Sequence, residues 1–319
     1  MPVPTNTRQT YGAVGIREDL SNIIYNIAPD DTPFMSNIGK SSCANTYFEW
    51  QTDTLAAADA TNVVAEGDDA SALAVAEPTR RGNYTQISRK VIQTSGTAEA
   101  VDFAGRKSTE AYQMAKRAKE LKLDMEKMLL SNNGMVAGSS GTARETGGVG
   151  AWVQSNLENG TATALPADYG TTAPTPGADK AVVESDIRDL MKQCWDAGAQ
   201  PDILMVDGAL KQKISTLSQS VSDLRTTANN QSPAFVVAAV DIYVSDFGNL
   251  KIVPNRQMPA KTCYFLDYDF WDIAYLRNFQ TTDLAKTGDS MSKMLVVEYG
   301  LRARNEEANG AILGWDPAL

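Results

Sequence analysis

The chain contains no histidine among its 319 residues. Because histidine is the only side chain whose ordinary pKa lies near neutrality, proton shuttling by imidazole is excluded. Catalytic triads with a histidine base, and zinc or iron sites with histidine ligands, are excluded for the same reason. Any enzyme chemistry would have to rest on carboxylates, lysine or tyrosine.

Cysteine and long apolar runs are also scarce. The three cysteines, Cys43, Cys194 and Cys263, lie far apart and form no CxxC pair, which indicates reduced thiols rather than a disulfide framework. The longest apolar run, residues 234–240, is too short to cross a bilayer. The N-terminus carries no apolar core of the kind that signal peptides have. We therefore expect a protein made in a cytoplasm, without contact to a membrane.

Basic residues are outnumbered, with 29 lysines and arginines against 39 aspartates and glutamates, so that the net charge is −10. Proteins that read nucleic acid usually carry a basic stripe, but no run here exceeds two basic residues. We expect no sequence-specific binding of nucleic acid. With 43% apolar and 21% charged residues, the composition is that of an ordinary globular protein.

The N-terminal segment, residues 1–42, is interrupted by prolines and glycines, and only a turn or two of helix is expected in it. It nevertheless carries apolar side chains such as Tyr11, Ile16 and Phe34, which is unusual for a free tail. We expect this segment to need another surface on which to lie.

Two strand-like runs follow. Residues 46–55 alternate, with Phe48 and Trp50 on one face, and residues 83–94 form the second run. Between them, residues 56–82 are rich in alanine and aspartate. We interpret the whole as a long hairpin, and because a lone two-stranded hairpin is marginally stable, we expect it to rest on something else.

Residues 104–130 show the clearest helical pattern in the chain. Asp102 is the expected N-cap, and Asn132-Asn133-Gly134 the expected stop. Such a helix would be about 40 Å long. We interpret its apolar stripe as core packing rather than a binding groove. The stripe consists of Ala111, Met114, Ala118, Leu121, Met125 and Met128.

The second half has a different organisation. A glycine-rich loop at 134–150 and a linker at 156–180 precede helices at 182–197 and 208–219, with a strand at 202–207 between them. Helices in the middle and antiparallel strands towards the end predict an α+β fold. The later strands are expected at 234–245, 249–253, 262–267, 271–279 and 293–304.

Two motifs could suggest phosphate chemistry. Gly147-Gly148-Val149-Gly150 resembles part of a phosphate loop, but no Lys-Ser/Thr follows it, which disfavours nucleotide binding. Asp207, after an apolar run, could be a phosphotransferase nucleophile, yet Ala209 stands where a second carboxylate is usual. We interpret Asp207 as the N-cap of the following helix.

The best carboxylate cluster is Asp267, Asp269 and Asp272. On a strand the first two share a face, so a hard cation is conceivable, and a solvated acidic face is the competing interpretation. A carboxylate-dependent enzyme built on this cluster is one alternative function. We assign no catalytic, metal-ligating or cofactor-binding residue and expect no cofactor.

Charge is unevenly distributed. Residues 56–79 carry five acidic residues and no basic one, a net charge of −5, whereas residues 104–130 carry seven basic and four acidic residues, a net charge of +3. Opposite charges on two extended segments predict docking, within one chain or between copies. The competing interpretation is two solvated faces, because single surface ion pairs contribute little.

The order of these segments resembles that of the major capsid proteins of tailed bacteriophages, which share the Hong Kong 97 fold. Two N-terminal stretches, YGAVGIREDLSNIIYNIAPDDTPFMSNIG and NTYFEWQTDTL, are similar to one major head protein family. The same family is also similar to the helical stretch DFAGRKSTEAYQMAKRAKELKLDMEKMLL and to the loop GGVGAWVQSN. These stretches cover about half the chain, and the C-terminal half matches in pattern.

The resemblance implies a structural protein that forms hexamers and pentamers of an icosahedral head around double-stranded DNA, without sequence-specific DNA binding. The implied partners are other copies of the chain, a portal protein and optional separate scaffolding and decoration proteins. The implied location is the virion. An encapsulin-like compartment shell is the alternative within the fold. The implied division is an N-terminal arm (1–42), an E-loop (43–97), a P-domain with the spine helix (98–164), an A-domain (165–270), P-domain return strands (271–304) and a C-terminal A-domain segment (305–319).

Contacts between subunits are expected on the arm, the E-loop and the spine helix, with the acidic E-loop docking near basic residues of an adjacent helix. The expected contact residues are Tyr11, Ile16, Phe34, Phe48, Trp50, Asp59, Glu66, Asp68, Asp69, Arg80, Arg81, Lys116 and Lys119.

Overall fold

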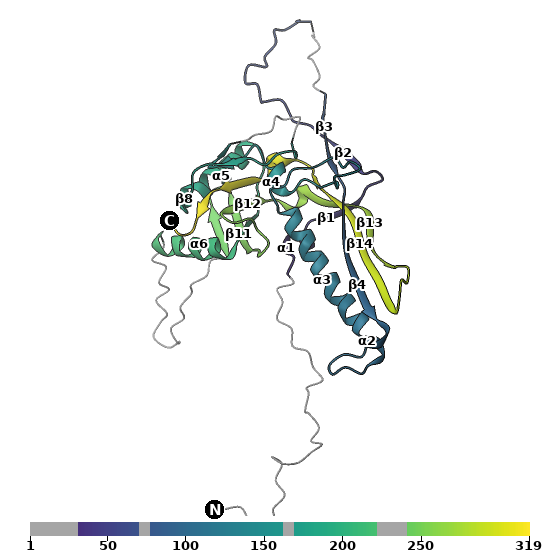
Figure 1. The fold of residues 1–319 in the computed structure, drawn as a ribbon. Coiled ribbons are helices and arrows are strands. Elements are labelled where there is room, and N and C mark those ends of the chain that lie inside the picture. The colour runs from purple at the N-terminus through teal and green to yellow at the C-terminus, as the bar shows by residue number, and fades with distance from the viewer. Residues whose placement is uncertain (1–30, 70–76, 162–168, 222–240) are drawn as a thin grey trace, which may run out of the picture.

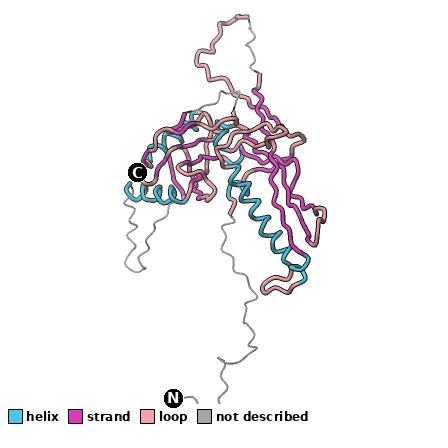
Figure 2. The backbone as a smooth tube through the Cα atoms, in the orientation of Figure 1, coloured by secondary structure: helices cyan, strands magenta, loops and turns pink. Residues whose placement is uncertain are grey.

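Two sheets organise the chain in the computed structural model, which describes residues 31–69, 77–161, 169–221 and 241–319 (Figure 1). A four-stranded sheet has the order β1-β13-β14-β4, and a six-stranded sheet has the order β10-β11-β9-β12-β15-β5. Figure 2 shows long strands and one long helix on one side of the molecule and shorter elements on the other. The predicted α+β class is confirmed.

The four-stranded sheet consists of β1 (Gly39–Ser42), β13 (Trp271–Asp283), β14 (Ser290–Ala303) and β4 (Gln86–Ser95). β1 runs parallel to β13, and the other pairs are antiparallel. Helix α3 (Thr109–Leu129) runs beside β4 and β14 (Figure 1). Apolar side chains of α3 and of alternate β14 residues therefore share one core.

Helix α3 begins later than the sequence predicts. Its N-cap is Ser108, whose hydroxyl accepts a hydrogen bond from the Ala111 N–H at 3.2 Å, and not Asp102. The segment before it forms a separate short helix, α2 (Gly96–Ala100), followed by a turn. The chain reverses its direction over these residues, between the end of β4 and the start of α3 (Figure 1). The predicted core packing is confirmed for Leu121 and Met125, which are fully buried, and for Met114 and Ala118, which pack against the same core, whereas Ala111 is exposed.

The six-stranded sheet is covered by α5 (Glu184–Asp196) and α6 (Gly208–Val221), close to the predicted ranges. Asp207 caps α6, as predicted, by accepting a hydrogen bond from the Leu210 N–H at 2.7 Å. The strands are β10 (Ile242–Ser245), β11 (Gly248–Pro254), β9 (Ile203–Val206), β12 (Thr262–Leu266), β15 (Gly310–Leu313) and β5 (Leu157–Glu158).

The hairpin differs from the prediction. Strand β2 (Tyr47–Thr52) pairs with β3 (Thr79–Tyr84), and the run predicted at 83–94 belongs mostly to β4, which pairs with β14 instead. The break is at Thr85, whose N–H donates to the Thr46 carbonyl and whose hydroxyl donates to Glu298. The hairpin therefore ends where the chain joins the four-stranded sheet.

Within the described residues, no helix combines the length and apolarity that a membrane crossing needs.

Short elements complete the fold. The short elements are α1 (Pro33–Asn37), α4 (Val149–Trp152), β6 (Gly160–Thr161), β7 (Thr175–Pro176), β8 (Lys180–Ala181), β16 (Trp315–Asp316) and the 3₁₀ turns Tyr268–Phe270 and Glu306–Ala308.

Candidate functional site

The lower part of the hairpin, residues 47–50 and 81–85, packs against the four-stranded sheet, and we call it the hairpin foot. Phe48 is 6% exposed and stacks on Trp50, with 5.9 Å between the ring centroids. It can approach the sheet because residue 300 is glycine, where a Cβ would lie 2.5 Å from Cε1 of Phe48. The foot is thus fixed by close packing.

Asn83 ties the foot to two other segments. Its amide nitrogen donates to the carbonyls of Leu301 at 2.7 Å and Gly147 at 3.3 Å. Its amide oxygen accepts from the N–H groups of Gly147 and Tyr84, both at 2.9 Å. Asn83 is fully buried, so every one of these bonds replaces water that the backbone groups have lost.

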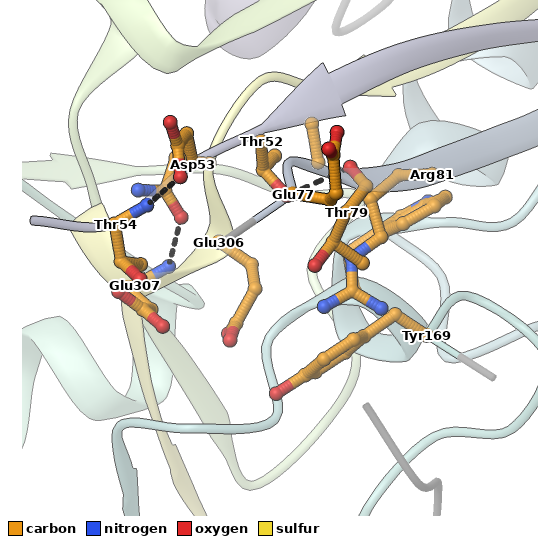
Figure 3. Close-up of a pocket in the computed structure, with 12 residues that line it drawn as sticks. Thr52, Asp53, Thr54, Glu77, Thr79, Arg81, Tyr169, Glu306 and Glu307 are labelled. Carbon is orange, nitrogen blue, oxygen red and sulfur yellow. Dashed lines mark hydrogen bonds between the residues drawn. The ribbon is translucent and has the colours of Figure 1, made fainter. Parts of the chain in front are cut away.

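A cavity of about 300 Å³ lies beside the foot (Figure 3). Figure 3 shows the Arg81 guanidinium above the Tyr169 ring, 4.4 Å from its centroid, with Glu306 nearby. Burial raises the pKa of the Tyr169 hydroxyl. Glu306 accepts hydrogen bonds from the N–H groups of Gln154 and Ser155, so its carboxylate serves as a structural acceptor. Charged lining residues are Asp53, Glu77, Arg81, Glu306 and Glu307.

Residues 53–69, which we call the hairpin tip, extend away from both sheets (Figure 1). Leu55 is 100% exposed, Val63 83% and Val64 81%. The hydrogen bonds that the tip makes with described residues are local. Asp59, for example, accepts from the hydroxyl and the N–H of Thr61, and these bonds hold the pKa of its carboxyl below the ordinary value. The tip therefore exposes apolar side chains that the described part of its own chain does not cover.

The acidic tip and the basic helix do not meet within one chain. The tip lies at one end of the molecule, and α3 runs towards the opposite end (Figure 1). Asp68 and Asp69 are exposed at the tip, and Lys116 and Lys119 are exposed on α3. If these charges pair, they must do so between copies.

The remaining expected contact residues lie in different environments. Phe34 and Phe48 are buried in the core of their own chain, so their side chains are unavailable to a neighbour. Arg80 forms an ion pair with Glu49 across the hairpin. Of the others, Trp50 packs against Trp152, and Asp59 and Glu66 are exposed on the tip. Tyr11 and Ile16 lie outside the described residues.

The interpretation of Asp267 and Asp269 as neighbours on one strand face is wrong. Asp267 caps a 3₁₀ turn by accepting from the Asp269 N–H at 3.0 Å. Asp272 is fully buried, and its carboxylate pairs with Arg304 at 3.0 Å and Arg302 at 3.4 Å. Within the described ranges, no group of three or more acidic or cysteine side chains could hold a metal ion.

The glycines at 147–150 have a packing role. A Cβ at Gly148 would lie 2.3 Å from the Ser131 carbonyl, and one at Gly150 would lie 2.0 Å from Oδ1 of Asn132. Gly147 bonds to Asn83. Close backbone approach therefore accounts for the motif.

Sequence reasoning missed the roles of Asn83 and Gly300. The only signal was indirect, since an asparagine within a strand-like run is unusual and a strand glycine often marks close approach. Neither signal names the partner segment.

Comparison with known proteins gives a consistent result. Residues 3–316 match the family model described as SU10 major capsid protein. The major capsid protein of Escherichia phage Phieco32 is 31% identical over 335 aligned positions, covering 95% of each protein. A chain of the Cyanophage A-1(L) capsid asymmetric unit is similar in structure, with a TM-score of 0.69 at 11% identity, covering 94% of this chain and 97% of that chain.

A chain of the holo-SrpI encapsulin complex from Synechococcus elongatus PCC 7942 is less similar, with a TM-score of 0.50 at 9% identity, covering 93% of each chain. The structural likenesses confirm the Hong Kong 97-like fold. The family match and the 31% identical relative favour a phage head over an encapsulin-like compartment or an enzyme. The chain belongs to the SU10 major capsid protein family and is a structural protein of a phage head.

Proposed function

We propose that the chain assembles by placing its hairpin tip on a neighbouring copy, which builds hexamers and pentamers of an icosahedral head around double-stranded DNA. One observation carries this proposal. The tip holds three large apolar side chains at least 81% exposed, on a foot that is buried in the chain's own core. Apolar area left uncovered in a single chain is available for burial between chains.

Charge supports a particular partner surface. Of the acidic residues of α3, Glu110, Glu120 and Asp124 form ion pairs, and Glu126 is buried. This leaves the exposed face of the helix basic, with Lys116 among its residues. We propose that the acidic residues of the tip dock near Lys116 and Lys119 of an adjacent copy. Arg81 and Trp50 hold the base of the hairpin rather than meeting the neighbour.

The implied division into arm, E-loop, P-domain and A-domain remains part of the proposal. It is supported by the separation of the two sheets, with α3 beside the four-stranded sheet and α5 and α6 on the six-stranded sheet. Because β4 pairs with β14 and the hairpin foot packs against the four-stranded sheet, we propose that the projecting part of the E-loop is the hairpin beyond its foot. A portal protein, separate scaffolding and decoration proteins, and assembly in the host cytoplasm also belong to the proposal.

A charge swap tests the docking. We expect Asp68→Lys with Asp69→Lys to leave the chain folded, by circular dichroism, and to reduce shell formation, by negative-stain microscopy and sedimentation. Adding Lys116→Asp and Lys119→Asp should restore shells. As a control, Asp189→Lys with Asp246→Lys changes the net charge equally at two exposed aspartates on the six-stranded side.

The outcomes separate two parts of the proposal. If the double reversal assembles normally, the electrostatic pairing is wrong. If shells also form when residues 54–77 are replaced by a two-residue Asn-Gly turn, the tip is not an assembly contact at all.

A further inference from the structure

An open pocket of about 350 Å³ is lined by residues of α1, α3 and β13. Its apolar lining consists of Met35 in α1 and of Tyr275 and Phe279 in β13, whose ring centroids are 6.5 Å apart. Phe279 is 37% exposed, although it belongs to an inner strand of the four-stranded sheet. The described part of the chain therefore leaves apolar surface open in this pocket.

The pairing of the strands explains why Phe279 is uncovered. β1 pairs with β13 only from Asp272 to Tyr275, and helix α3 runs beside β4 and β14. From Arg277 onward, the residues of β13 are exposed. Among the described residues, no further strand follows β1 along this edge of β13. The edge is therefore open to another segment.

The charged residues of the pocket are basic. Lys40 and Lys122 line it and are exposed, and the described residues that line it include no acidic one. Neither lysine takes part in an ion pair within the described part of the chain. An occupant that fits this pocket is therefore a segment that has one apolar side and carries negative charge.

The chain itself supplies such a segment next to the pocket. Thr32 lines the pocket, and residues 1–30 lie outside those that the structure describes. Residues 18–31, EDLSNIIYNIAPDD, contain four acidic residues and no basic one. Their large aliphatic residues recur at spacings of three and four, which is typical of one face of a helix. These aliphatic residues are Leu20, Ile23, Ile24 and Ile27.

The connection to the pocket is short. Ile27 lies five positions before Thr32, a span of at most about 17 Å in an extended chain. A segment tethered so closely has an effective concentration on the order of millimolar, which favours it over the same segment of another copy. The occupant is therefore expected to come from the same chain.

We propose that residues 18–30 dock in this pocket of their own chain, with the aliphatic face on Phe279 and the acidic residues near Lys40 and Lys122. Residues 1–17 are then the part of the N-terminal arm that is left to reach a neighbouring copy. This inference is independent of how the hairpin tip docks.

Limited digestion of the unassembled full chain with chymotrypsin tests the docking, because cleavage requires the segment to leave the pocket. Tyr25 lies within the segment and Tyr11 before it, so mass spectrometry compares a protected and an unprotected site in one molecule. We expect Phe279→Asp to speed cleavage after Tyr25 by about tenfold and to leave cleavage after Tyr11 unchanged. Phe103→Asp is the matched control, since Phe103 is also 37% exposed but does not line the pocket, and it should change neither rate.

The two lysines provide a second variant if the first fails to fold. Lys40→Glu with Lys122→Glu changes only exposed side chains and should also speed cleavage within the segment, because it replaces attraction by repulsion. Adding Asp30→Lys with Asp31→Lys should slow that cleavage again. Equal cleavage rates at the two tyrosines of the unmodified chain, or rates that respond to neither variant, would overturn the proposal.

A disulfide determines which copy supplies the segment. Cys43→Ser first removes the one cysteine that is not buried. In that background, Ile24→Cys with Phe279→Cys should form a disulfide that runs as a single chain on a non-reducing gel. Asn22→Cys with Phe279→Cys, with the first cysteine on the opposite face of the expected helix, is the control and should form less. A disulfide-linked dimer, or no disulfide at all, contradicts docking within the chain.

Discussion

The hairpin foot and the hairpin tip belong to one hairpin, yet their contacts differ in kind. At the foot, Asn83 bonds to Leu301, 218 positions away in the sequence, and Phe48 lies against Gly300. At the tip, Asp59 bonds to Thr61, two positions away, and Leu55 is wholly exposed. The same hairpin thus contributes to the stability of its own chain at one end only.

This difference separates stability from assembly along one hairpin. Long-range contacts at the foot form when the chain folds and should contribute to its free energy of unfolding. Side chains that are equally exposed in the folded and unfolded chain contribute little to that free energy. Substitutions at the foot should therefore change the folding of a single chain, whereas those at the tip should change what copies do together.

The largest effect on unfolding is expected at Asn83. Asn83→Ala removes four hydrogen bonds and leaves buried groups of Gly147 and Leu301 without partners. We expect it to lower the free energy of unfolding by about 3 kcal/mol, measured by urea denaturation. Asn62→Ala, the same change at the exposed tip, is the control and should alter it by less than about 0.5 kcal/mol. Equal effects would remove the distinction between the two ends.

A smaller effect is expected at the contact between the foot and the sheet. Gly300→Ala places a Cβ 2.5 Å from Phe48 and should lower the free energy of unfolding by about 2 kcal/mol through overpacking. Phe48→Leu in the same chain should relieve part of this cost, so the double variant should be more stable than the sum of the two single effects. If the two changes in the free energy of unfolding simply add in the same denaturation experiment, Gly300→Ala and Phe48 are not in steric conflict.

The upper end of β3 should show a still smaller effect. Arg80 pairs with Glu49, but its side chain is 67% exposed. We expect Arg80→Ala to cost about 0.5 kcal/mol, and the coupling with Glu49→Ala in a double-mutant cycle should weaken in high salt. A coupling that is large and insensitive to salt would mean that the foot extends further up the hairpin than burial indicates.

The sequence predicts the regular elements well where one pattern suffices. The apolar spacing in α3, the capping of α6 by Asp207 and the alternation in β14 all lead to the observed structure. The residue pattern does not predict the structure where pairing with a distant strand determines where an element ends. Residues 83–94 alternate throughout, and only the bonds of Thr85 to Thr46 and Glu298 show where the hairpin ends.

The candidate contacts were harder to predict for the same reason. Phe48 and Leu55 are both apolar residues of one hairpin region, yet Phe48 is buried against Gly300 and Leu55 is exposed. Glu126 gives no signal in the sequence, since an acidic residue on an amphipathic helix ordinarily faces water. Its buried carboxylate accepts hydrogen bonds from Phe34 and Asn255, which are 92 and 129 positions away.

The smallest effect on unfolding is expected at the tip, where a substitution should separate the stability of a single chain from the assembly of copies. Leu55→Ser with Val63→Ser and Val64→Ser should leave the urea denaturation curve almost unchanged, because these side chains are exposed in the folded chain. Burying such a side chain between copies contributes about 1.5 to 3 kcal/mol, so shell yield by sedimentation should fall. A large loss of unfolding free energy would place the tip in the core of its own chain. Unchanged stability with normal shells would mean that neighbouring copies do not cover these side chains, and the tip would then meet its neighbour through charge alone.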